Sequence, residues 1–229
     1  MTLPDYIDLY CERTAPGLWN EPINALSNAA FLVAAWLAWR VYARRGRHDA
    51  PDLIVIILAA AIGIGSFLFH TFANGWSEMA DVIPIWTFVS IFVLVTIHRL
   101  TGENIWATAR IALIVVGSIG VVFWFTSGDV TTGEASGPGY LNGSLQYLPA
   151  LLALMVFAAA TWVHRHPARV YVTAAAIIFL VSLGFRTIDL MTCAATGIGT
   201  HFMWHILNGV MVGLLLQALL RYLPAQRES

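Results

Sequence analysis

The chain has 229 residues, of which 59% are hydrophobic and 11% are charged, and its formal net charge is −1. Its mean hydropathy of +0.73 lies outside the range of ordinary soluble domains, so we expect a polytopic membrane protein. The near-neutral charge provides no extended basic surface, and the arginines are spread over loops. Nucleic acid is therefore excluded as an expected partner.

The first residues, MTLPDYIDLYCERT, are acidic and polar. They lack the basic start, the short apolar run and the small-residue cleavage site of a secretory signal peptide. We therefore expect no removable signal peptide. Residues 1–21 are predicted to form a tail before a first hydrophobic helix that directs membrane insertion itself.

Apolar windows long enough to cross a hydrocarbon core of roughly 30 Å, which takes about 20 residues per helix, can be placed seven times along the chain. The predicted helices lie near residues 22–43, 52–72, 80–98, 105–126, 144–164, 169–190 and 200–222. The expected fold class is therefore all-α, with residues 1–229 forming a single bundle of seven transmembrane helices.

The arginines of the short loops predict the orientation of this bundle. They lie after the first, third and fifth predicted helices and in the C-terminal tail, whereas the second, fourth and sixth loops carry no arginine or lysine. The positive-inside rule then places the N-terminus outside and the C-terminus in the cytoplasm. This orientation brings His70, Asp81, Arg186, His201 and His205 to one level near the outer side.

Two apolar stretches, SFLFH at 66–70 and HFMWH at 201–205, contain histidines inside predicted helices. His201 and His205 are four residues apart and share a helix face, so His70 from another helix would complete the three-histidine set of a catalytic zinc site. Zinc is expected because three neutral imidazoles with an open position suit it, although other divalent metals would be accepted. Ionisable groups inside membranes are costly and usually mark functional sites. The alternative is that these histidines are structural and hydrogen-bonded within the bundle.

Ser66 and Asp81 are the candidate catalytic residues beside this centre. Ser66 lies one helical turn before His70, and Asp81 follows eleven residues after it across a short turn. Zinc would lower the pKa of a bound water and polarise a substrate carbonyl. Asp81 would take the proton of that water and return it to a leaving group, and Ser66 would hydrogen-bond the water or the oxyanion. Ser66 could instead bond back to a carbonyl of its own helix.

The outer side also carries Cys11 and Cys193. Topology and an oxidising exterior permit a disulfide between them, and two free thiols are the alternative.

The tail further contains Asp8, Glu12 and Glu21, whose oxygens suit a hard cation such as calcium. Because the tail lacks the glycine and spacing of an EF-hand loop, capping and solvation are alternative roles for these carboxylates.

Taken together, these residues resemble the alkaline ceramidase family, which is related to the adiponectin and progestin receptors. The matching stretches are YCERTAPGLWNEPINALSN, SFLFHTFANGWSEMADVIPIW and IDLMTCAATGIGTHFMWHILNG. The resemblance implies that His70, His201 and His205 bind zinc and that Ser66 and Asp81 are catalytic. It also implies a disulfide between Cys11 and Cys193. It also places Glu12 and Glu21 at calcium-ligand positions, whereas Asp8 lies one residue earlier than the family aspartate.

The resemblance further implies hydrolysis of the amide bond of ceramide, or of a related N-acyl lipid, to a fatty acid and a sphingoid base or amine. The partners would then be a lipid substrate and the bilayer itself, and short loops favour a bacterial inner membrane. The alternative is a seven-helix receptor or transporter in which zinc is structural or is the cargo. A light-driven pump is excluded because the chain has no lysine to hold retinal.

Overall fold

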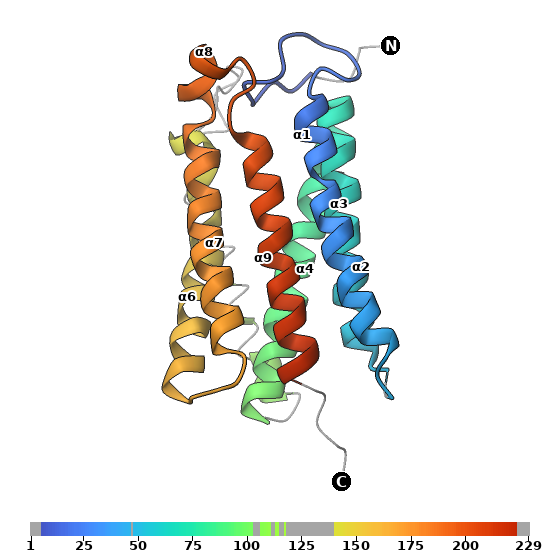
Figure 1. Ribbon diagram of the computed structural model, residues 1–229, viewed down its shortest axis with the longest axis vertical. Coiled ribbons are helices and arrows are strands. Elements are labelled where there is room, and N and C mark those ends of the chain that lie inside the picture. Colours follow the sequence, from blue (N-terminus) through green and yellow to red (C-terminus); the bar gives the residue numbers. More distant parts are fainter. Residues whose placement is uncertain are drawn as a thin grey trace.

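The computed structural model describes residues 6–46, 48–102, 106–110, 113–114, 117 and 140–223. The regular secondary structure of this part of the chain is helical, apart from an isolated bridge between Tyr6 and Asn74, and the tail before residue 22 is coil and turns. The elements are α1 (Pro22–Ser27), α2 (Ala29–Ala43), α3 (Ala50–Phe72), α4 (Gly75–Thr101), η1 (Tyr140–Tyr147), α6 (Leu148–Val163), α7 (Arg169–Ile188), η2 (Leu190–Thr192), α8 (Cys193–Thr196) and α9 (His201–Tyr222). The long helices form one bundle, with the N-terminal tail and α8 at one end and the end of α9 at the other (Figure 1).

Six helical segments of the described chain are long and apolar enough to cross a membrane. They are Pro22–Ala43, Ala50–Phe72, Gly75–Leu100, Leu141–Val163, Arg169–Ile188 and His201–Tyr222. The chain is therefore an integral multi-pass membrane protein. The remaining helix predicted from the sequence, near residues 105–126, falls largely outside the described residues.

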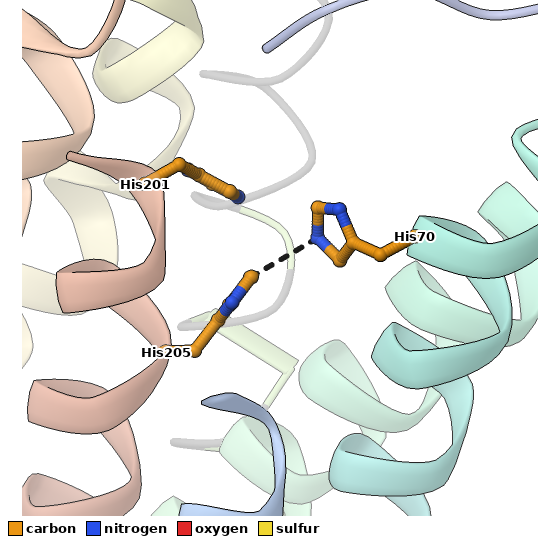
Figure 2. A group of neighbouring side chains, drawn as sticks. All are labelled: His70, His201 and His205. Atoms are coloured by element: carbon orange, nitrogen blue, oxygen red, sulfur yellow. Dashed lines mark hydrogen bonds between the residues drawn. The ribbon is translucent and has the colours of Figure 1, made fainter. Parts of the chain in front are cut away.

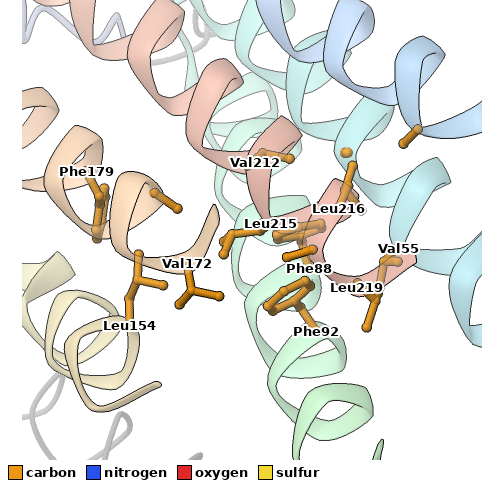
Figure 3. Packing of buried hydrophobic residues seen from close by; sticks show 14 of the residues in the cluster. Val55, Phe88, Phe92, Leu154, Val172, Phe179, Val212, Leu215, Leu216 and Leu219 are labelled. Atoms are coloured by element: carbon orange, nitrogen blue, oxygen red, sulfur yellow. The ribbon is translucent and has the colours of Figure 1, made fainter. Parts of the chain in front are cut away.

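Helix α9 runs through the middle of the bundle and is the centre of the apolar core. Figure 3 shows Leu216 and Leu219 of α9 beside Phe88 and Phe92 of α4. Since lipid is as apolar as the core, helices in membranes associate mainly by close van der Waals packing, which small residues permit. Gly209 of α9 lies so close to α2 that a Cβ there would overlap Ala30. This close packing fixes the register of α9, and with it the position of its two histidines.

Helix α4 begins earlier than the sequence predicted. Asn74 and Ser77 form a capping box, in which each side chain accepts a hydrogen bond from the backbone N–H of the other. Because these bonds satisfy N–H groups that a helix start leaves free, α4 begins at Gly75 instead of near residue 80. Asp81 consequently lies in the second turn of α4, one turn deeper in the bundle than a residue at the helix start.

Helices α3 and α4 are in close contact beside the candidate catalytic residues. Pro84 lies inside α4 and has no N–H, so the Ala80 carbonyl lacks its usual helical partner. Gly65 of α3 lies against this carbonyl, and a Cβ at Gly65 would overlap it. The contact brings Ser66 and Asp81, the next residues on each helix, to facing positions.

The opposite end of the bundle is held by a buried ion-pair cluster. The carboxylate of Asp52 at the start of α3 is fully buried and lies 2.9 Å from Nη1 of Arg45 and 2.7 Å from Nη1 of Arg99. Arg99 also donates a 2.8 Å hydrogen bond to the carbonyl of Leu223. The cluster therefore ties α3, α4 and the end of α9 together, far from the histidines.

Candidate metal centre and active site

Three histidines from two helices meet at the end of the bundle that the tail covers. His70 lies in the last turn of α3, and His201 and His205 lie in the first two turns of α9. Figure 2 shows the three side chains grouped together, with His70 reaching across from α3 towards His205. One nitrogen from each ring lies within 4.8 Å of the others, and the exposed fractions of the residues are 1%, 1% and 3%. The group could hold a metal ion.

The hydrogen bonds on the outer side of two rings fix which nitrogens are free. Ser27 donates its single hydroxyl hydrogen to the Asn24 carbonyl at 2.7 Å, so at 2.8 Å it must accept from Nδ1 of His205. The Glu21 carboxylate likewise accepts from Nδ1 of His70. When both rings are neutral, both Nε2 atoms carry lone pairs, and this is the tautomer that metal-binding histidines adopt when an outer partner accepts from the other nitrogen.

The spacing of these lone pairs fits a metal. Nε2 of His70 and Nε2 of His205 are 3.1 Å apart, which is a hydrogen-bond distance when one ring is protonated and is unfavourable when both rings are neutral and both nitrogens are acceptors. Two nitrogens bound tetrahedrally to zinc are separated by roughly 3.3 Å, so a shared cation would resolve the repulsion. Nδ1 of His201 is also buried without a hydrogen-bond partner. The residues present therefore fit zinc or a similar divalent ion.

Ser66 and Asp81 border a small cavity next to this group. Its volume is about 20 Å³, which is enough for one water molecule. The lining residues are Tyr10, Phe31, Ile62, Ser66, Asp81, Ile85, Tyr147, Arg186, His201, Trp204 and His205. Oδ1 of Asp81 is buried without a hydrogen-bond partner, and the Ser66 side chain interacts with the Asp81 carboxylate. A hydroxyl, a carboxylate and two of the three imidazoles thus meet at one water-sized space.

Arg186 is a functional candidate to which the sequence assigned no role. Its guanidinium lies between three aromatic rings, 5.6 Å from the centroid of Tyr10, 5.4 Å from Tyr147 and 5.3 Å from Trp204. Nη1 donates to the Tyr10 hydroxyl at 3.1 Å, whereas Nε is buried without a partner. The aromatic faces stabilise the buried cation. An arginine inside an apolar helix was the available signal, because such charges are costly in a membrane.

The tail is fixed over the site by a disulfide and by Asp189. Cys11 and Cys193 are bonded, which confirms the disulfide implied by the family resemblance. Asp189, which follows α7, accepts hydrogen bonds from the backbone N–H groups of Thr200 at 2.7 Å, His201 at 2.9 Å and Cys11 at 3.0 Å. One buried carboxylate thereby holds both the start of α9 and the tail. Tyr10, next to Cys11, stacks on the His201 ring at 3.6 Å between centroids.

The three acidic residues of the tail lie in separate environments. Asp8 is exposed and accepts from the Tyr6 hydroxyl at 3.3 Å. Glu12 accepts from the backbone N–H groups of Ile23 at 2.7 Å and Asn24 at 2.8 Å, so it caps the start of α1. Among the described residues, the carboxylates do not gather into a group of metal ligands, whereas the three histidines do. As they lie, these acidic residues do not fit a calcium site.

Burial and neighbouring charges shift the pKa values of three residues in the tail. Burial raises the pKa of Glu12, although the two backbone N–H groups that it accepts from act in the opposite direction. Burial also acts to raise the pKa of Glu21, but hydrogen bonding and charge interaction with His70, followed by Arg13, outweigh it, and the pKa is lowered. Burial raises the pKa of Tyr10 despite the nearby Arg186. Of Glu12 and Glu21, it is therefore Glu21 whose ionised form is favoured.

The fold and the site together define a multi-pass membrane protein with a candidate metal centre inside its helix bundle. A family model described as Ceramidase matches residues 10–229, and the chain therefore belongs to the ceramidase family, as the sequence motifs indicated. Membership implies a hydrolase of lipid amides with a lipid substrate, and the apolar helices imply a bilayer around the protein. No match to a curated protein was found.

Proposed function

We propose that the chain is an intramembrane zinc-dependent hydrolase that cleaves the amide bond of ceramide or a related N-acyl lipid with water. The observation that carries the proposal is a group of three buried imidazoles, two of which line one small cavity together with the Asp81 carboxylate and the Ser66 hydroxyl. His70, His201 and His205 would hold the zinc, which suits three neutral imidazoles. Membership of the ceramidase family supports a lipid amide as the substrate.

The two catalytic residues have distinct tasks in this reaction. Zinc supplies Lewis acidity, which polarises the amide carbonyl and makes a water molecule more acidic. Asp81 accepts a proton from the attacking water and donates it to the amine nitrogen as the carbon–nitrogen bond breaks, so that a carboxylic acid and an amine leave. The Ser66 hydroxyl donates a hydrogen bond to the former carbonyl oxygen while that oxygen carries negative charge.

The placement of the protein in its membrane is part of the proposal. We place seven spans in the plasma membrane of a bacterium, with the N-terminus outside and the zinc site near the outer side. Two features, one at each end of the helix bundle, support this orientation. The disulfide lies at the site end and suits an oxidising exterior, and Arg45, Arg99, Arg165 and Arg169 lie at the other end of the spans, as the positive-inside rule expects.

The test combines metal analysis with product analysis. Purified protein in detergent micelles is incubated with a panel of ceramides and other N-acyl lipids, and released fatty acid is measured by mass spectrometry. The wild type should contain stoichiometric zinc and release fatty acid. Asp81→Asn should keep the zinc and lower the rate by about 10² to 10⁴, the usual contribution of a general base, whereas His201→Ala should lose zinc. Stoichiometric zinc without release from any lipid would contradict the proposal and favour a receptor or transporter.

A further inference from the structure

Arg13 is a buried cation in the tail, and three oxygens surround its guanidinium. The residue is 4% exposed. Its Nε is paired with the Glu21 carboxylate, Nη2 donates to the carbonyl of His70 at 2.8 Å, and Nη1 donates to the carbonyl of Gly17 at 3.3 Å. The planar fork of an arginine is suited to bind several oxygens at once in this way. The guanidinium therefore neutralises a buried carboxylate and joins the tail to α3.

The contacts of Arg13 converge on one proposed metal ligand. Glu21, which Arg13 neutralises, is the acceptor that fixes the Nδ1 proton of His70. The His70 carbonyl, which Arg13 also binds, lies in the last turn of α3, where helical carbonyls have no partner within the helix. A cation at a helix C-terminus is also favoured by the helix dipole. Arg13 thus holds His70 through both its ring and its main chain.

The same contacts give every carboxylate oxygen at the positions that the family resemblance indicated at least one donor from the protein itself. Both oxygens of Glu12 accept from backbone N–H groups of α1. One oxygen of Glu21 is paired with Arg13, and the other accepts from His70 and from the Asn24 amide. Calcium requires six to eight oxygen ligands. The positive charge that a divalent ion would bring to Glu21 is already supplied by the side chain of Arg13.

We propose that Arg13 is the resident cation of the tail, that it is a positioning residue for His70, and that the histidine centre of this chain needs no calcium. The inference rests on metal binding by the histidines, which is part of the proposed function, but it does not depend on the reaction or the lipid. It predicts that loss of the guanidinium weakens metal binding by the three imidazoles, although the hydrogen bonds of Arg13 go to the His70 main chain and to Glu21 and not to these rings.

The experiment measures metal affinity instead of hydrolysis. Full-length protein in detergent is stripped of metal and titrated with Zn²⁺ against a competing chelator, and with Co²⁺ while its visible absorption is recorded. Arg13→Gln should weaken Zn²⁺ binding by about 10- to 100-fold, the usual effect of removing an outer-shell partner, and should change the Co²⁺ spectrum. Arg13→Lys, which keeps the charge without the fork, should lie between this variant and the wild type.

The matched control is Arg45→Gln, which removes a guanidinium from the carboxylate of Asp52 at the opposite end of the bundle. It should lower heat stability and leave the metal affinity and the Co²⁺ spectrum unchanged. Calcium titrated into the wild type should give no binding signal, and a calcium-selective chelator should not alter Zn²⁺ affinity. Stoichiometric calcium binding by the wild type, or equal Zn²⁺ affinity in the two glutamine variants, would overturn the inference. Tight, Arg13-dependent Zn²⁺ binding in a protein that cleaves no lipid would support it and contradict only the proposed reaction.

Discussion

The two ends of the bundle each bury a carboxylate near an arginine, but the charges are used differently. At the opposite end, Asp52 is ion-paired with both Arg45 and Arg99. At the site end, Asp81 and Arg186 line one cavity, and Oδ1 of Asp81 and Nε of Arg186 are buried with neither a hydrogen bond nor an ion pair among the described residues. Oδ1 of Asp52 also lacks a hydrogen bond, but it is ion-paired with Arg99 at 2.7 Å. The charges of the first arrangement are paired with one another, whereas the second keeps polar atoms that could bind a ligand.

This difference separates groups that stabilise the fold from groups that are available to a ligand. Buried polar atoms in native proteins are nearly always paired, so unpaired ones call for an explanation such as a catalytic role or a bound ion. Their desolvation also costs stability. At the site end, the disulfide of Cys11 and the hydrogen bonds of Asp189 hold the structure around the unpaired groups. The comparison predicts that substitution of the unpaired groups at the site end affects function more than stability, and that substitution of the paired charges at the opposite end does the reverse.

The largest difference is expected between Asp52 and Asp81. Asp52→Ala leaves the buried guanidinium of Arg99 unpaired and should lower the free energy of unfolding by about 3–5 kcal/mol, the usual cost of breaking a buried pair. Asp81→Asn replaces a carboxylate that lacks an ion-pair partner with a neutral amide, so the free energy of unfolding should stay the same or rise. Thermal unfolding in micelles measures both. Equal destabilisation by the two substitutions would remove the distinction between the ends.

The disulfide should contribute the next largest effect. Replacing Cys11 and Cys193 by serine should lower the free energy of unfolding by about 2–4 kcal/mol, because the crosslink constrains the unfolded chain. Since Tyr10 stacks on His201, loss of the crosslink should also weaken Zn²⁺ binding. The unfolding midpoint is measured with and without reductant. A reductant should lower the midpoint of the wild type and leave the serine variant unchanged, and a wild-type midpoint insensitive to reductant would argue against the role.

Gly65 offers a smaller and more local test. Gly65→Ala places a Cβ on the Ala80 carbonyl, so α3 and α4 must separate beside Ser66 and Asp81. Misplacement of catalytic groups by about 1 Å can cost roughly 10²-fold in rate, and overpacking costs about 1–3 kcal/mol of stability. Fatty acid release and thermal unfolding are measured together.

The matched control is Gly184→Ala in α7, where an added Cβ meets no atom within 4 Å. An alanine in a helix is favoured over glycine by about 1 kcal/mol, so this variant should be as stable as the wild type or more stable, with unchanged activity. If both alanine variants behave alike, close approach of α3 and α4 does not position the catalytic pair.

What could be predicted from the sequence follows from periodicity and composition. Hydropathy located six spans, and helical spacing placed His201 and His205 on one face, because both properties are encoded within single helices. The family resemblance supplied the disulfide. By contrast, the contact of Gly65 with Ala80 depends on the register between two helices, which no pattern within either helix specifies.

The tail shows the same limit. Its acidic residues suggested calcium, since oxygen-rich stretches suit hard cations. Whether a carboxylate is free depends on the path of the coil, which folds back so that Glu12 caps α1 and Arg13 reaches Glu21. The start of α4 could have been predicted from the sequence, because Asn74 and Ser77 have the spacing of a capping box.

The smallest expected effect comes from Ser27, and it is the most selective. Ser27→Ala removes the acceptor that fixes the Nδ1 proton of His205, so the ring can take the other tautomer and present a protonated nitrogen to the centre. Zn²⁺ affinity, measured by chelator competition, should fall by about tenfold, with little change in the unfolding midpoint. Thr87→Ala is the control, because that hydroxyl bonds only to the Ile83 carbonyl of its own helix. If the two variants bind Zn²⁺ equally, the Ser27 hydrogen bond does not tune the centre. If they differ as expected, one neutral hydrogen bond at the site end alters metal binding without altering stability, the reverse of what Arg45→Gln should do at the other end.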